Sequence, residues 1–226
     1  MKRISLLKTA LFFTVAMLAL QTAALAGPPL LCRPFDIGEA RSLPWQQGRD
    51  WASVKADYDL NRLVPETLAL LEPRVPVIVR METLRRATIY TRNSPEIASE
   101  LLARLRARAI EAESKRLTDP MAYFDYGYLV ETYRQAHWIS RATNEAYWNF
   151  KQLSPDVDGY GWVLKALSSS TTNPAIEFAA ALITTDGGSR ARHNEHLQKA
   201  RNAAAGDSLL ARNLVLVFPA QGKKGA

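Results

Sequence analysis

Four times along this chain a small polar residue is followed directly by proline. Ser, Asp and Asn favour the position that caps a helix start, because their side chains accept hydrogen bonds from free backbone N–H groups there. Proline is favoured in the first helical turn, where its missing N–H is not needed. Each pair therefore predicts a helix start: Ser94-Pro95, Asp119-Pro120, Ser154-Pro155 and Asn173-Pro174.

The segment after the first of these pairs has the spacing of an amphipathic helix. Oppositely charged residues stand four positions apart, Glu100 with Arg104 and Glu111 with Lys115, in the orientation that stabilises a helix surface. The arginine-rich run within it therefore predicts a solvated face rather than a patch for nucleic acid or anionic lipid. Apolar residues recur every fourth position on the other face: Ile97, Leu101, Leu105 and Ala109.

Helical spacing continues to about residue 217 and predicts an all-α fold. Short turns between consecutive helices favour antiparallel helix hairpins, arranged as an α-α superhelix or an irregular bundle. The apolar run at 213–218 is equally compatible with a helix or a strand. The predicted helices are 65–71, 77–92, 95–115, 120–139, 144–153, 160–168, 174–184, 191–204 and 209–217.

The chain divides into four segments by composition. Prolines interrupt residues 27–60 repeatedly, so we expect an irregular N-terminal strap lying against the surface of a domain, with a docking segment as the alternative. The helical domain follows at 61–218, and 219–226 are a flexible tail that contains two lysines. Residues 1–26 form the remaining segment, which has a distinct pattern of charge and apolarity.

The first 26 residues have the order of a secretory signal peptide. Basic residues precede an apolar run of about 11 residues from Ala10 to Leu20, and Ala24-Leu25-Ala26 forms a small-x-small exit before Gly27. A bilayer span needs about 20 apolar residues, so cleavage is favoured over a retained anchor. We expect export to the periplasm or the cell exterior, with no transmembrane span after signal removal.

Removing this segment changes the charge of the chain. The whole sequence has 29 basic and 22 acidic residues, a formal net charge of +7, and three of the basic residues precede Gly27. The remaining 26 basic residues against 22 acidic residues leave +4, of which Lys223 and Lys224 in the tail carry two. A charge this small gives no electrostatic footprint for nucleic acid.

Cys32 is the one cysteine of the sequence, so an intramolecular disulfide is impossible. In an oxidising compartment a free thiol of this kind is buried and inert, bridged to another chain, or reactive. We favour the buried thiol, because Arg33 is the one neighbour in sequence that would lower its pKa.

Aromatic residues concentrate between positions 123 and 162. The stretch Tyr123-Phe124-Asp125-Tyr126-Gly127-Tyr128-Leu129, followed by Ala146, resembles the aromatic, small and alanine positions of a tetratricopeptide repeat over residues 120–153. This resemblance implies a concave surface that binds peptides or proteins without catalysis.

Most of these aromatic side chains are expected to pack between helices, and some to line a groove. Tyrosine and tryptophan suit a binding groove because each has a rigid apolar plane with a hydrogen-bonding edge. From residue type, the predicted contacts are Tyr126, Tyr133, Trp148 and Tyr160.

The string His193-Asn194-Glu195-His196 is the most metal-like pattern in the chain. Histidines three positions apart lie near one another on a helix, and Asp186 just upstream would add a carboxylate. The spacing is not that of a zinc protease helix, which needs four positions, and the neighbourhood is cationic. A solvated helix start is the preferred interpretation, and no cofactor is expected.

These patterns predict an exported helical binding or scaffold protein that recognises a protein, a peptide or a cell-envelope component without catalysis. One alternative is a metal-dependent hydrolase that uses His193, His196 and Glu195. The other is an envelope structural protein that self-associates through Cys32.

Overall fold

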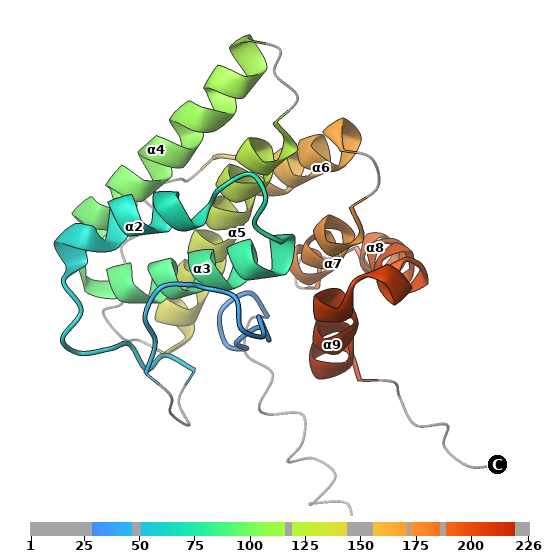
Figure 1. The fold of residues 1–226 in the computed structure, drawn as a ribbon, viewed down its shortest axis with the longest axis horizontal. Coiled ribbons are helices and arrows are strands. Elements are labelled where there is room, and N and C mark those ends of the chain that lie inside the picture. The colour runs from blue at the N-terminus through green and yellow to red at the C-terminus, as the bar shows by residue number, and fades with distance from the viewer. Residues whose placement is uncertain are drawn as a thin grey trace, which may run out of the picture.

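The computed structural model describes residues 29–46, 51–115, 119–143, 156–170, 173–185 and 189–219, and the regular structure within these ranges is helical, without strands. The predicted all-α class is therefore confirmed, and all of the ambiguous run at 213–218 except its last residue, Phe218, belongs to a helix (Figure 1). The helices are α2 Leu63–Leu70, α3 Val77–Tyr90, α4 Pro95–Ser114, α5 Pro120–Thr143, α6 Gly159–Ser169, α7 Pro174–Ile183, α8 Arg190–Asn202 and α9 Ser208–Val217. Short 3-10 helices cover Leu60–Arg62, Thr91–Asn93 and Ala204–Gly206.

The polar-proline pairs mark helix starts as predicted wherever the structure describes them. Asn173 accepts a hydrogen bond from the backbone N–H of Ala175, and Asp119 accepts one from that of Ala122, at 3.0 Å. Ser94 precedes α4 without a side-chain capping bond. The remaining pair, Ser154-Pro155, lies outside the described residues, and so does the predicted helix 144–153. The tetratricopeptide resemblance therefore stays a prediction.

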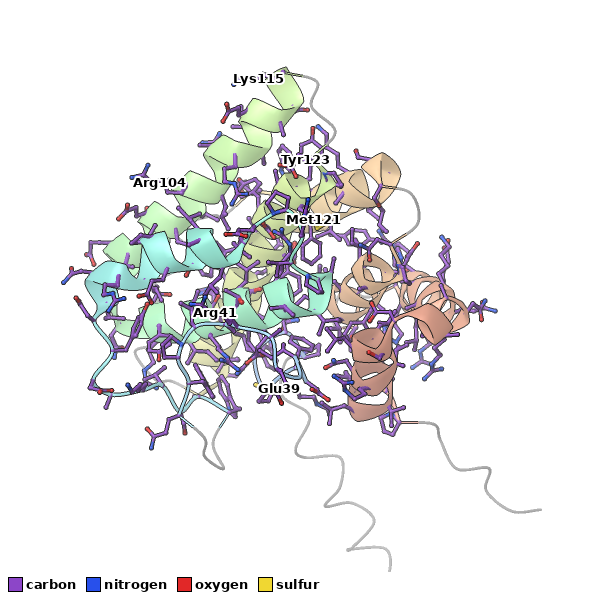
Figure 2. All side chains as sticks on the ribbon, in the orientation of Figure 1. Glu39, Arg41, Arg104, Lys115, Met121 and Tyr123 are labelled. Carbon is purple, nitrogen blue, oxygen red and sulfur yellow. The ribbon has the colours of Figure 1, made fainter. Side chains whose placement is uncertain are left out.

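The helices form two neighbouring groups, α2 to α6 and α7 to α9, which meet mainly where α6 packs on α7. α5 packs against α3, α4 and α6, while α7 packs against α8, and α9 closes the C-terminal side against α7 and α8 (Figure 1). The charge pairs of α4 form as expected, Glu100 with Arg104 at 3.5 Å and Glu111 with Lys115 at 2.5 Å. Figure 2 shows Arg104 and Lys115 along this helix. Within the described residues, no helix combines the length and the apolarity that crossing a membrane requires.

α3 is buried along almost its whole length although it carries several charged residues. Its Arg80 donates to Asp125 of α5 at 2.6 Å, and its Arg85 donates to Glu82 at 2.7 Å, with all four side chains 0–1% exposed. A buried charge is tolerated only when it is paired, which these contacts provide. Burial outweighs the attraction of Arg80 and raises the pKa of Asp125 to about 6.

The N-terminal strap is irregular, as expected, but it belongs to the core rather than lying on a finished surface. Arg85 donates to the carbonyl oxygens of Leu31 and Trp51 at 2.9 and 3.0 Å, and Arg86 donates to that of Leu43 at 2.6 Å. Leu31 and Leu43 are completely buried. Arg85 and Arg86 of α3 thus fix the N-terminal strap, which has no regular backbone hydrogen bonding of its own within its described residues.

Candidate functional site

An apolar groove lies between α8 and α9. Its volume is about 890 Å³, and it is lined by Leu197, Arg201, Ala204, Ala211, Leu214, Val215, Val217, Phe218 and Pro219. α9 buries Leu214 and Val217 of the groove lining, whereas Val215 of the same lining is 72% exposed and the adjacent Leu216 is 53% exposed. Among the described residues, neither of these two large apolar side chains packs into the hydrophobic core.

α9 is held in place by the N-terminal strap. Asn213 is fully buried and accepts a hydrogen bond from the backbone N–H of Asp36 at 2.9 Å, while its amide donates to the Asp36 carbonyl at 2.8 Å. The Asp36 carboxylate accepts a bond from Arg212 at 2.6 Å. Asp207 caps the start of α9 by accepting from the backbone N–H of Leu210. One wall of the groove therefore depends on residues far away in sequence.

The end of the groove beside the last turn of α9 is cationic. Arg201 donates to the carbonyl of Phe218, and Arg33 of the strap donates to that of Val217, both at 3.2 Å. The C-terminus of a helix attracts positive charge, because its last carbonyl groups carry the negative end of the helix dipole. Both guanidinium groups thus lie beside an apolar surface.

A polar cluster of Glu177, His196 and Tyr160 joins α6, α7 and α8. Glu177 lies 2.5 Å from Nδ1 of His196, and Nε2 of His196 lies 2.7 Å from the hydroxyl of Tyr160. Glu177 and His196 are 8% and 6% exposed, whereas Tyr160 is half-buried. Burial raises the pKa of Tyr160, and the nearby charge of Arg192 opposes this effect.

The backbone at Tyr160 is fixed by close packing of α6 on α5. A Cβ atom on Gly127 would lie 2.5 Å from the carbonyl oxygen of Gly159, so these two glycines allow the backbones to touch. The backbone N–H of Tyr160 donates to Glu131 at 3.0 Å. Burial raises the pKa of Glu131, and Arg134 opposes this effect as its ion-pair partner.

The structure places two of the four predicted aromatic contacts in the core. Tyr126 and Tyr133 are 2% and 1% exposed, so neither presents a surface to a partner. Tyr126 packs edge-to-face on Trp162, and the Tyr133 hydroxyl donates to the carbonyl of Ala98 at 3.1 Å. Trp148 lies outside the described residues, and Tyr160 joins the polar cluster described above.

The residues of the metal-like string point to different partners. Nδ1 of His193 lies 2.9 Å from the Ala181 carbonyl, Glu195 is exposed and pairs with Lys199, and His196 faces Glu177. Asp186 lies outside the described residues. Among the residues that the structure does describe, no three His, Cys, Asp or Glu side chains form a metal-binding group.

Cys32 is half-buried and free. Burial raises the pKa of its thiol to about 11, although Arg85 and Arg33 act in the opposite direction. Because the thiolate is the reactive form, the structure favours an inert thiol here.

No protein family model, curated protein or solved structure matches this chain. Local sequence patterns do not single out Glu177 or the residues that line the groove. The signal for Glu177 was a carboxylate within an otherwise apolar helix, Ala175-Ile176-Glu177-Phe178-Ala179, where a buried charge needs a partner.

Proposed function

We propose that this chain is an exported helical protein that binds an acidic, amphipathic segment of a partner protein or peptide in the groove between α8 and α9. The order of charges and apolar residues in 1–26 supports the export. The observation that carries the binding function is the pair of exposed apolar side chains, Val215 and Leu216, beside an apolar groove.

Exposed apolar surface of this kind is typical of an interaction site. Single exposed hydrophobic residues are common on monomers, but a contiguous patch rimmed by polar residues indicates a partner. An amphipathic helix places apolar residues at every third or fourth position, which suits a groove lined by side chains of two helices. Burying such a face contributes a favourable free energy of about 25 cal/mol for each Å² of apolar surface removed from water.

The charge at the end of the groove selects among partners. Arg33 and Arg201 bond to carbonyl oxygens, while the nearby Lys199 and Arg212 already pair with Glu195 and Asp36. A carboxylate on the partner would therefore meet guanidinium groups whose charge is not balanced by those pairs. Opposite charges across an interface increase both association rate and specificity.

A designed peptide tests this proposal. The probe is a fluorescein-labelled amphipathic helical peptide with leucine on one face and glutamate on the other, titrated with the protein and followed by fluorescence anisotropy. We expect saturable binding, and Val215→Asp should weaken it at least about tenfold, because it places a carboxylate in the apolar contact and repels the acidic peptide. Ile110→Asp is the matched control, since Ile110 is 43% exposed on α4.

Three outcomes would contradict the proposal. The peptide fails to bind the wild-type protein, or Val215→Asp and Ile110→Asp bind it equally well. In the third, sedimentation shows a dimer of the wild-type chain that Val215→Asp dissolves, which would assign the groove to a second copy instead.

A further inference from the structure

The cluster of Glu177, His196 and Tyr160 is separate from the groove although α8 contributes to both. Leu197 lines the groove, while the adjacent His196 contacts side chains of α6 and α7. We propose that Tyr160 is a nucleophile that accepts a phosphoryl group from an activated phosphate ester, with His196 as its general base and Glu177 as the residue that positions this base.

The hydrogen bonds fix the direction of proton movement. A carboxylate only accepts hydrogen bonds, so Nδ1 of His196 carries the proton that faces Glu177. In the neutral imidazole, Nε2 then has a free lone pair and accepts the hydroxyl proton of Tyr160. This order of a buried carboxylate, an imidazole and a hydroxyl is the arrangement by which a base activates a weak nucleophile.

A base is needed at this position because burial raises the pKa of Tyr160, which keeps the phenol neutral near pH 7. Glu177 and His196 are shielded from solvent, whereas Tyr160 is half-buried at the surface end of the chain of bonds. Tyr160 is thus the most exposed member of the three.

The nucleophile is also held in position from its backbone. Gly159, directly before Tyr160, packs against Gly127 with no space for a Cβ atom, and Glu131 binds the N–H of Tyr160. Such fixed geometry lowers the entropy lost in reaching the reactive arrangement.

A cation beside Tyr160 favours an anionic phosphoryl group as the electrophile. The guanidinium carbon of Arg192 lies 5.8 Å from the centre of the Tyr160 ring. Arg192 is exposed and its charge acts on the phenol. Positive groups beside a transferring phosphoryl group stabilise the charge on its oxygens in the transition state.

The step balances without a metal or a redox partner. Oη of Tyr160 forms a bond to phosphorus while the bond from phosphorus to the leaving-group oxygen breaks and its electron pair leaves with that oxygen. The phenolic proton moves to Nε2 of His196 and then, through solvent, to the departing alcohol or phenol. The products are a phosphotyrosine at 160 and the free alcohol or phenol.

The experiment uses p-nitrophenyl phosphate as the probe. We expect a single-turnover release of p-nitrophenol and, by peptide mass spectrometry, a phosphate on Tyr160. Tyr160→Phe should abolish both signals, and His196→Gln should slow them at least about 100-fold, since the general base is lost. In the wild-type protein the rate should fall in acid, because a protonated imidazole cannot accept the phenolic proton, and His196→Gln should lack this fall.

A second tyrosine provides the control. The hydroxyl of Tyr58 donates to Glu66 at 2.7 Å and is also half-buried, but the structure shows no histidine bonded to it, so it should stay unlabelled. Equal labelling of Tyr58 and Tyr160, no phosphate on Tyr160, or a His196→Gln variant as fast as wild type would each overturn the proposal. If His196→Gln does not fold by near-UV circular dichroism, a wild-type rate that is constant in acid overturns it instead.

Discussion

Gly127 and Gly159 determine how closely α5 and α6 approach each other. Gly127→Ala places a Cβ atom 2.5 Å from the Gly159 carbonyl oxygen, a backbone atom that cannot move aside by itself. We expect the free energy of unfolding to fall by about 1–3 kcal/mol, measured by urea denaturation, although alanine is the better helix former. Labelling of Tyr160 should fall as well, because α6 is displaced.

Gly206→Ala is the control for this substitution. Apart from Gly206 itself and its two chain neighbours, no residue has an atom within 4 Å of the position that a Cβ at Gly206 would take, so the added methyl group meets open space. Its unfolding free energy should therefore change little. If Gly127→Ala is as stable as Gly206→Ala, the contact between the two helix backbones does not limit their packing.

Residue type alone predicted the aromatic sites poorly, for a physical reason. Tyr126, Tyr133 and Tyr160 have the same side chain, but the first two are enclosed by neighbouring helices and only Tyr160 reaches solvent. Local spacing does not say which faces of a helix other helices cover. The polar cluster was missed for the same reason, since Glu177 and His196 meet across 19 positions of sequence.

At the scale of elements, α9 depends on the strap for its position. Asn213→Ala removes the bonds to the N–H and carbonyl of Asp36 and also the bond to the Leu209 carbonyl. We expect a loss of about 2 kcal/mol or more in unfolding free energy, because part-buried backbone groups lose their partners. The affinity for the acidic peptide should fall too, since α9 forms one wall of the groove.

Ser114→Ala separates this effect from the simple loss of a polar side chain. Ser114 is exposed in the last turn of α4 and bonds only to the Glu111 carbonyl among the described contacts. Its removal should leave both measurements nearly unchanged. A variant at Asn213 that keeps wild-type peptide affinity would show that the strap does not position the groove.

The helices were predictable because their signals are local. Caps, first-turn prolines and the 3.6-residue period each act over a few positions, and most predicted boundaries differ from the structure by no more than two residues; the end of α5 at Thr143 is four residues later. The groove was not predictable, because it requires Leu197 of α8 and Val215 of α9 to come together. Neither was the burial of Arg80 and Arg85, whose partners lie on other segments as well as on α3.

At the scale of the whole molecule, the buried start of the strap follows the predicted export segment by only a few residues of sequence. Leu30 and Leu31 are fully buried, and the N–H of Leu30 donates to Gln135 of α5 at 2.9 Å. The predicted cleavage after Ala26 lies only a few residues upstream. Because an extended chain advances at most about 3.6 Å per residue, a protease acting at this site on the folded protein would work close to its surface.

We therefore expect cleavage before the strap is buried, during export of the unfolded chain. Protein recovered from the exported fraction should begin at Gly27, as determined by N-terminal sequencing and intact mass. Val15→Arg, which interrupts the apolar run, should leave the uncleaved precursor inside the cell, while Thr9→Ser before the run should be processed normally. An exported wild-type chain that retains Met1 would instead show that this segment acts as an anchor.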